Sequence, residues 1–295
     1  MADARFCVGF SSACKQAREG GGLPGCAPEY RGVSADGCLV FYPRRLWLPP
    51  DIVRLIDALV RRLEHEDTLV SMSGGGLGRT LCEAAAAGGL RDVRFLLARG
   101  AEVEFRTFYV NGAGDVESDF TALEWSARHG HLAVATALLD AGAVERDAAL
   151  HTAAFYGHTP VVALLLDRGA DVSFDDGEPL IVSAQNGHLA TATLLLDRGA
   201  DVNAQNGSPL LVAAQNGRLK MVTLLLDRGA DLHADADRAL RAAADRGQVE
   251  VVRLLLDRGA NIHAGNDYAL RAARREGHTA VVVLLLERSA LEPQA

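Results

Sequence analysis

The sequence predicts an all-α solenoid of stacked helix-turn-helix repeats, and two observations lead to this prediction. First, the segment LLLDRGA recurs at a spacing of 30 residues, which is typical of small units that bury their apolar faces only by stacking on one another. Its copies lie at 164–170, 194–200, 224–230 and 254–260, followed by LLLERSA at 284–290. Second, apolar residues inside each unit follow helical spacing, with glycines between the runs.

Residues 208–231 show how one unit is built. Pro209 occupies the first position of a helix behind Ser208, a residue type that caps helices. A second helix is expected from about Leu219 to Asp227. Gly229 ends it, because glycine adopts a positive φ without a steric penalty. The unit is therefore a helix, a tight turn, a second helix and a short loop.

This unit resembles an ankyrin repeat. It carries P-L-x-x-A-A-x-x-G at 209–217, and the run L-L-x-x-G-A-D-V-N is complete at 195–203. The resemblance implies about seven repeats. Ankyrin repeats usually have about 33 residues and a β-hairpin finger between units, so the shorter period predicts shortened fingers. Units with NDYAL at 266–270 also look like those in ankyrin proteins of large amoeba-infecting DNA viruses.

Three segments are expected along the chain. Residues 1–45 are glycine-rich, lack periodicity and are predicted to be partly disordered, apart from a strand-like run at Cys38–Tyr42. Residues 46–79 form a helical segment. Residues 80–295 form the ankyrin-repeat domain, and Thr80 with Glu83 has the spacing of a capping box at its first helix.

The helical segment allows two interpretations. LPPDIVRLIDAL at 48–59 resembles the first half of an F-box, the motif that docks a substrate receptor onto the linker subunit of a cullin ubiquitin ligase. The resemblance implies recruitment through Leu48, Pro49, Ile52, Ile56 and Leu59. Alternatively, the helix caps the exposed apolar end of the solenoid, as terminal units of repeat arrays must. Both interpretations remain open from the sequence.

Composition narrows the possible functions. The formal net charge of −8 argues against nucleic acid as a partner, because phosphate binding needs a clustered basic surface. No apolar run approaches the roughly 20 residues of a membrane span. Five cysteines without a CxxC pair or a nearby histidine cluster predict a reduced, cytoplasmic chain without bound metal, in the host cytoplasm if the source is viral. We expect no cofactor and no catalysis, since no residues occur at the spacing of a catalytic motif.

The ankyrin resemblance also implies a binding surface for a protein partner of unknown identity. In this family the concave face is lined by finger tips and by the two residues before the glycine that ends each first helix. We call these pairs the concave row: Ala86-Ala87, Arg128-His129, Phe155-Tyr156, Gln185-Asn186, Gln215-Asn216, Asp245-Arg246 and Arg275-Glu276. The row changes from repeat to repeat while the core hardly does. This is the pattern expected of a recognition surface in an adaptor or other protein-binding module.

Within the row, Phe155 and Tyr156 are predicted to make the strongest contacts, because aromatic side chains dominate interface energetics. The alternative is that Phe155 turns inward and fills space beside the short connection at 144–148. An insertion at 102–120 is also rich in aromatic residues, and Asn111-Gly112 is a hairpin-turn signal within it. It either binds a partner or folds onto its own repeat.

Two further patterns concern single residues. Histidines at 131, 158, 188 and 278 each follow the glycine between the two helices, so they are expected to bond to the backbone and not to a metal. Ser289 replaces the glycine that ends the second helix in four preceding copies. A serine in the left-handed region costs about 1 kcal/mol, so the usual turn should be missing there.

Asp-Arg pairs at the ends of the second helices are expected to form a solvated face.

Overall fold

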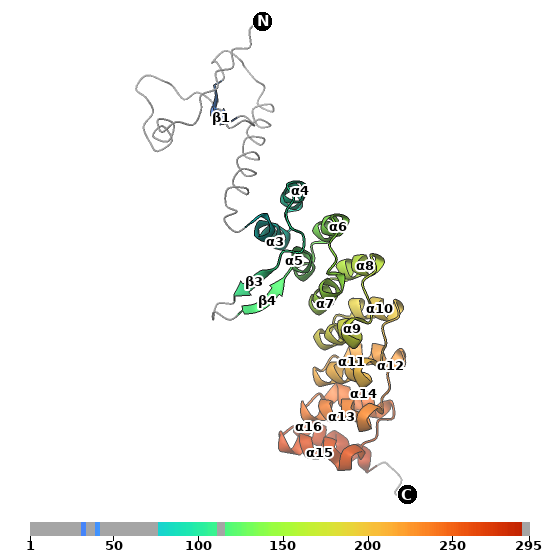
Figure 1. Ribbon diagram of the computed structural model, residues 1–295. Coiled ribbons are helices and arrows are strands. Elements are labelled where there is room, and N and C mark those ends of the chain that lie inside the picture. Colours follow the sequence, from blue (N-terminus) through green and yellow to red (C-terminus); the bar gives the residue numbers. More distant parts are fainter. Residues whose placement is uncertain (1–30, 34–38, 42–75, 111–115, 291–295) are drawn as a thin grey trace, which may run out of the picture. The chain divides into compact units, whose positions relative to one another are not determined.

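The computed structural model describes residues 31–33, 39–41, 76–110 and 116–290, and the chain divides into two compact units at Gly75 and Gly76 (Figure 1). In the first unit, β1 (Arg31–Val33) pairs antiparallel with β2 (Leu39–Phe41), with Gly32 opposite Val40. The predicted helix at 48–59 lies outside the described residues, as do the five residues proposed for ligase recruitment.

The second unit consists of seven helix pairs, which confirms the predicted all-α solenoid of seven repeats (Figure 1). The pairs are α3 (Leu77–Ala87) with α4 (Leu90–Ala98), α5 (Ala122–His129) with α6 (Leu132–Asp140), α7 (Arg146–Tyr156) with α8 (Thr159–Asp167), α9 (Phe174–Asn186) with α10 (Leu189–Asp197), α11 (Ala204–Gln215) with α12 (Leu219–Asp227), α13 (Ala234–Asp245) with α14 (Val249–Asp257), and α15 (Ala264–Arg275) with α16 (Thr279–Ser289). The predicted second helix at 219–227 has the bounds of α12.

The first helices of the pairs stack in one layer and the second helices in another (Figure 1). First helices bury alanines such as Ala213 and Ala214, whereas second helices bury larger residues such as Leu225. Small side chains let neighbouring backbones approach closely, and the first helices are in fact packed more tightly on one another than the second helices are. The stack therefore curves with the first helices on its concave side.

The turn between the two helices of a repeat is locked by the next repeat. Gly130 has a φ of 73°, and a Cβ there would lie 2.5 Å from Nδ1 of His158. The same histidine places Nε2 2.9 Å from the carbonyl oxygen of Arg128. Equivalent contacts join His131 to Ala86, His188 to Phe155, Arg218 to Gln185, Gln248 to Gln215 and His278 to Asp245. The predicted backbone bonding of the histidines is confirmed, and arginine or glutamine performs the same role in two repeats.

A short left-handed turn replaces the hairpin finger in the C-terminal repeats. Three consecutive residues have positive φ at 175–177, 205–207, 235–237 and 265–267. These turns are stacked closely, since a Cβ on Gly177 would lie 2.5 Å from the Cβ of Ala204. Ser208 does not cap the following helix, because its hydroxyl donates to the carbonyl oxygen of Gln205 at 2.9 Å. The expected cap was wrong because the left-handed turn brings that carbonyl within reach.

Two sequence predictions concern the helices at the ends of the array. At the start, α3 begins at Leu77 and not at Thr80, which is buried within the helix. A capping box is present instead at Thr121 and Glu124, at the start of α5. At the end, Ser289 is the last residue of α16 and Ala290 has a φ of −72°. The left-handed turn is therefore missing where serine replaces glycine, as predicted.

Candidate protein-binding face

The concave row lies along one edge of the first-helix layer. Its residues end the first helices or directly follow them, and each is half-buried or exposed. The backbone of the row is held in register, because the carbonyl group of the first residue in each of the first six pairs accepts a bond from the next repeat, for example Arg128 from His158. The structure therefore brings together the row predicted from the sequence.

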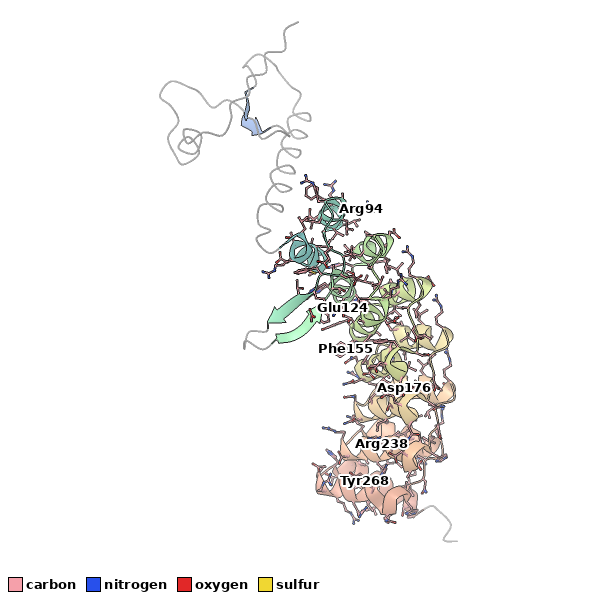
Figure 2. All side chains as sticks on the ribbon, in the orientation of Figure 1. Arg94, Glu124, Phe155, Asp176, Arg238 and Tyr268 are labelled. Atoms are coloured by element: carbon pink, nitrogen blue, oxygen red, sulfur yellow. The ribbon has the colours of Figure 1, made fainter. Side chains whose placement is uncertain are left out.

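Phe155 and Tyr156 are the last two residues of α7, and Phe155 is labelled in Figure 2. Their exposed fractions are 39% and 37%, and their rings meet edge to face with centroids 5.0 Å apart. A side chain turned into the core would be buried, whereas Phe155 is among the exposed large hydrophobic residues. The alternative of an inward-turned Phe155 is therefore wrong.

Arg128 lies among three aromatic rings. Its Cζ atom is 5.1 Å from the ring centroid of Tyr156, 5.6 Å from that of Trp125 and 5.7 Å from that of Phe120. Tyr156 comes from the next repeat and Phe120 from the insertion, so three separate segments meet at this guanidinium. Cation–π contacts of this kind contribute about 0.5–1 kcal/mol each at exposed sites.

Trp125 links the insertion to the concave row. Its Nε1 atom donates to Thr107 Oγ1 at 2.8 Å, its ring meets Phe120 edge to face at 5.3 Å, and it stacks on His129 at 6.0 Å. The sequence interpretation did not include Trp125 among the binding residues. Its spacing of four residues from His129 places both on one helix face and could have identified it.

We call Phe120, Trp125, Arg128, His129, Phe155 and Tyr156 the Arg128 cluster. Burial lowers the pKa of His129, and the nearby positive charges of His131, Arg128 and His158 lower it further. Arg128 therefore carries the permanent positive charge of the cluster, and none of its six residues is acidic, on a chain whose net charge is negative.

The insertion forms a β-hairpin, in agreement with its turn signal. β3 (Thr107–Val110) pairs antiparallel with β4 (Val116–Phe120), with Thr107 opposite Phe120. The base of the insertion packs on its own repeat, because Phe105 contacts the core and its carbonyl oxygen accepts from Cys82 Sγ at 3.4 Å. Its last residue, Phe120, belongs to the Arg128 cluster. The insertion thus packs on its own repeat and also extends the candidate site.

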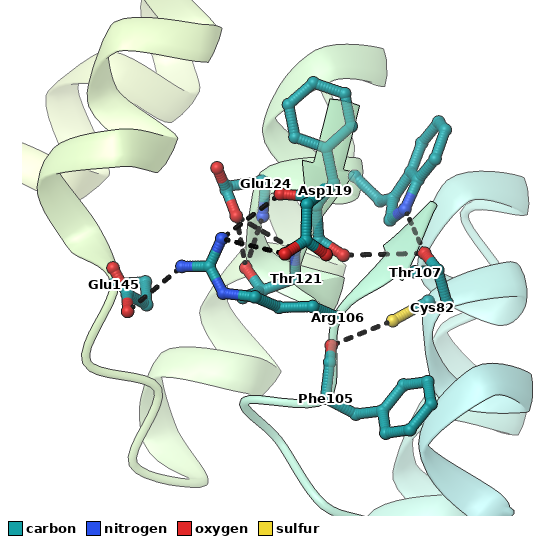
Figure 3. A network of polar contacts seen from close by, with 10 residues as sticks. Cys82, Phe105, Arg106, Thr107, Asp119, Thr121, Glu124 and Glu145 are labelled. Carbon is teal, nitrogen blue, oxygen red and sulfur yellow. Dashed lines mark hydrogen bonds and ion pairs between the residues drawn. The ribbon is translucent and has the colours of Figure 1, made fainter. Parts of the chain in front are cut away.

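A polar network fixes the hairpin to the following repeats (Figure 3). Arg106 pairs with Glu145 at 3.1 Å and donates to the carbonyl oxygen of Asp119 at 3.1 Å. Beside it, Glu124 is 5% exposed and accepts from Thr121 N at 2.9 Å and from Thr121 Oγ1 at 3.0 Å. Burial raises the pKa of Glu124, although the bonds from Thr121 and the charge of Arg106 oppose that shift.

A cleft of about 600 Å³ opens beside Trp125, between α3, the base of the insertion and α5. Its lining residues are Arg79, Cys82, Glu83, Ala86, Phe105, Arg106, Thr107 and Trp125. Burial raises the pKa of the Cys82 thiol to about 11. Because the thiolate is the nucleophilic form, this cysteine is unreactive at neutral pH. Across the described residues, no group of histidine, cysteine and carboxylate side chains could hold a metal ion.

Comparison with known proteins agrees with this architecture. The family model described as ankyrin repeats in three copies matches residues 81–176, 144–206 and 210–294. The chain belongs to the ankyrin-repeat family. Among solved structures, the crystal structure of the human ASB11 ankyrin repeat domain is similar with a TM-score of 0.62 and 30% identity, covering 73% of this chain and 99% of that one. No curated protein sequence matches the chain.

Some residues of the concave row bond to one another. Arg275 bonds to Asp245 at 2.9 Å and to Glu276 at 2.7 Å, and Asn186 donates to the carbonyl oxygen of Phe155 at 3.2 Å. A smaller hollow of about 300 Å³ lies here, lined by Leu211, Gln215, Arg238, Arg241, Ala242, Asp245 and Tyr268.

In the part of the chain that the structure describes, no helix is both long and apolar enough to cross a bilayer.

Proposed function

We propose that this ankyrin-repeat chain is a noncatalytic protein-interaction module that binds a protein partner through its concave row. The observation that carries the proposal is the exposure of two adjacent aromatic side chains, Phe155 and Tyr156, at the end of α7. Large aromatic residues left in solvent beside a stacked arginine are typical of interface hot spots. The half-buried polar residues on both sides supply the rim that excludes water around such contacts.

The test is the double substitution Phe155→Ala/Tyr156→Ala in the full chain. With the partner obtained by affinity purification from the native cell, calorimetry should show binding weakened by about 2 kcal/mol or more, roughly 30-fold. The melting temperature should hardly change, because both side chains are more than a third exposed. Val283→Ala in repeat 7, where the side chain is 50% exposed, is the matched control and should leave affinity unchanged. Unchanged affinity with a large loss of stability in the double variant would contradict the proposal.

A second candidate function rests on the F-box resemblance at Leu48–Leu59. In this proposal the chain is a substrate receptor, with the helical segment recruiting a cullin-ligase linker subunit and the repeats holding the substrate. Ile52→Asp or Ile56→Asp should then abolish co-purification of the linker while circular dichroism of the repeats stays unchanged. A lower thermal midpoint without any effect on co-purification would instead support a capping helix, because a buried charge is strongly unfavourable.

Cytoplasmic location remains a prediction from cysteine usage. It fits a chain whose described cysteine, Cys82, is a buried free thiol. Fluorescence microscopy of the tagged full-length chain in its native cell tests it. Accumulation in a secretory compartment would contradict it.

A further inference from the structure

We propose that the Arg128 cluster and the adjoining cleft recognise an acidic segment of the partner, with a carboxylate on Arg128 and a neighbouring apolar side chain in the cleft. This inference rests on the proposed function and specifies the chemistry of the partner. It is carried by three observations: the ring-bound geometry of Arg128, the distribution of charge along the concave row, and the position of Trp125 between the row and the cleft.

The guanidinium of Arg128 is oriented by neighbouring aromatic rings. The ring centroids of Tyr156, Trp125 and Phe120 lie 5.1–5.7 Å from Cζ of Arg128, and rings at this distance limit the orientations open to its guanidinium. A guanidinium held in this way loses less conformational entropy on binding than a freely rotating side chain. Its planar fork of N–H donors matches a carboxylate, with which it forms short, charge-assisted hydrogen bonds. The site therefore favours a ligand carboxylate over a neutral amide.

The N-terminal part of the concave row lacks negative charge. The row is free of carboxylates from Ala86 to Asn216, and its first acidic member is Asp245 in repeat 6. Within the same stretch Arg128 is the charged member of the row, and none of the residues of the Arg128 cluster is acidic. An acidic segment is attracted to this surface, whereas a basic segment is repelled. The cleft itself is mixed in charge, because Arg106 in its lining is already paired with Glu145 and Glu83 lies in the same lining, so it suits the apolar side chain and not the carboxylate.

The cleft beside Trp125 adjoins the Arg128 cluster. Trp125 belongs both to the Arg128 cluster and to the lining of the cleft, so the two features form one continuous surface. The cleft volume of about 600 Å³ lies within the usual range of about 300–1,000 Å³ for ligand sites. Phe105 and Ala86 give it apolar walls. The insertion supplies Thr107 and Phe120, which hold Trp125 in place.

The experiment uses the full-length chain carrying Trp47→Phe, which leaves Trp125 as the single tryptophan. Random twelve-residue peptides displayed on phage are selected on this chain, and selected peptides are then titrated while the emission of Trp125 is recorded. We expect selected sequences to carry Asp or Glu next to an apolar residue. Replacing that acid by its amide in the peptide should weaken binding at least tenfold, and so should Arg128→Gln in the protein.

Two variants control for general charge and folding. Arg246→Gln removes the same charge from the row in repeat 6 and should leave affinity within twofold. Arg128→Lys keeps the charge without the planar fork and should give an intermediate loss. Combining Arg128→Gln with the amide peptide should cost little more than either change alone, because both remove one shared contact.

Several outcomes would overturn the inference. They are selected peptides without acidic enrichment, equal binding to Arg128→Gln, or unchanged Trp125 emission at saturation. If such peptides still depend on Phe155 and Tyr156, the proposed function stands and the acidic partner is wrong. If the native partner itself is insensitive to the Phe155→Ala/Tyr156→Ala variant, the proposed function fails independently of this selection.

Discussion

Ala236 has a backbone conformation that suits other residues better. It is the middle residue of the left-handed turn at 235–237, with a φ of 52° and a ψ of 58°. The equivalent residues in the neighbouring turns are Asp176, Asn206 and Asn266. Asparagine and aspartate tolerate this region because their short side chains bond locally, whereas alanine has a Cβ penalty without that compensation.

We therefore predict that Ala236→Gly stabilises the chain by about 0.5–1 kcal/mol, since glycine has no Cβ to strain. The measurement is the free energy of unfolding from urea titration followed by circular dichroism. Ala242→Gly is the matched control in the right-handed part of the same helix, and it should destabilise by a similar amount. The same sign for both substitutions would show that the left-handed turn is not the cause.

Glu124 gives a pH-dependent prediction. Burial raises the pKa of this carboxyl above its ordinary value of 4.5, so the folded state favours the protonated form. Stability should therefore decrease as pH rises through 4.5 and then through the folded-state pKa, because the unfolded chain releases its proton first. Glu124→Gln removes the ionisation and keeps an acceptor for Thr121. The melting temperature of the variant should rise relative to wild type between about pH 4 and pH 7, and a difference that does not vary with pH would contradict the assignment.

At the scale of helices, the last repeat carries its own barrier to further stacking. The residue three positions before the inter-helix glycine is a fully buried alanine in six repeats: Ala85, Ala127, Ala154, Ala184, Ala214 and Ala244. In repeat 7 the same position is Arg274, which is exposed.

We predict that substitutions at these two positions differ strongly in their effect on the free energy of unfolding. Ala244→Arg should destabilise by about 3 kcal/mol or more, because it forces a charged side chain between stacked first helices. Arg274→Ala should change stability by less than about 0.5 kcal/mol, since it alters an exposed position. Urea unfolding of both variants checks the pair, and a tolerated Ala244→Arg would refute the close packing of the first-helix layer.

The Asp-Arg pairs of the second helices also act between elements. Each arginine pairs with the aspartate of the preceding repeat: Arg168–Asp140 at 2.8 Å, Arg198–Asp167 at 2.8 Å, Arg228–Asp197 at 2.9 Å, Arg258–Asp227 at 3.0 Å, and Arg288–Asp257. The predicted solvated face is thus also a ladder that ties neighbouring repeats. Because every pair is partly exposed, each contributes only about 0–1 kcal/mol.

For the whole array, stability should fall toward the C-terminal end. Repeat 7 has one neighbour in place of two, and Val283 and Leu286 remain 50% and 43% exposed. In a linear array each repeat depends on its nearest-neighbour interfaces, so the terminal one opens first. We predict that hydrogen exchange monitored by mass spectrometry shows less protection in α15 and α16 than in α11 and α12. Equal protection in both pairs would mean that the array unfolds as one unit.

The sequence by itself determined the repeat number, the bounds of helices such as Leu219–Asp227, and the bonding of His158. These follow from periodicity and local backbone preference, which repeat in every unit. Only the tertiary structure decided that Phe120, Trp125, Arg128 and Tyr156 meet, because the contact depends on how the insertion lies against α5 and how α7 stacks on it. It also decided that the short connections are left-handed turns and that Arg274 ends the stack, since both depend on the distance between neighbouring repeats. Local sequence fixes each unit, whereas the surface between units arises from their stacking.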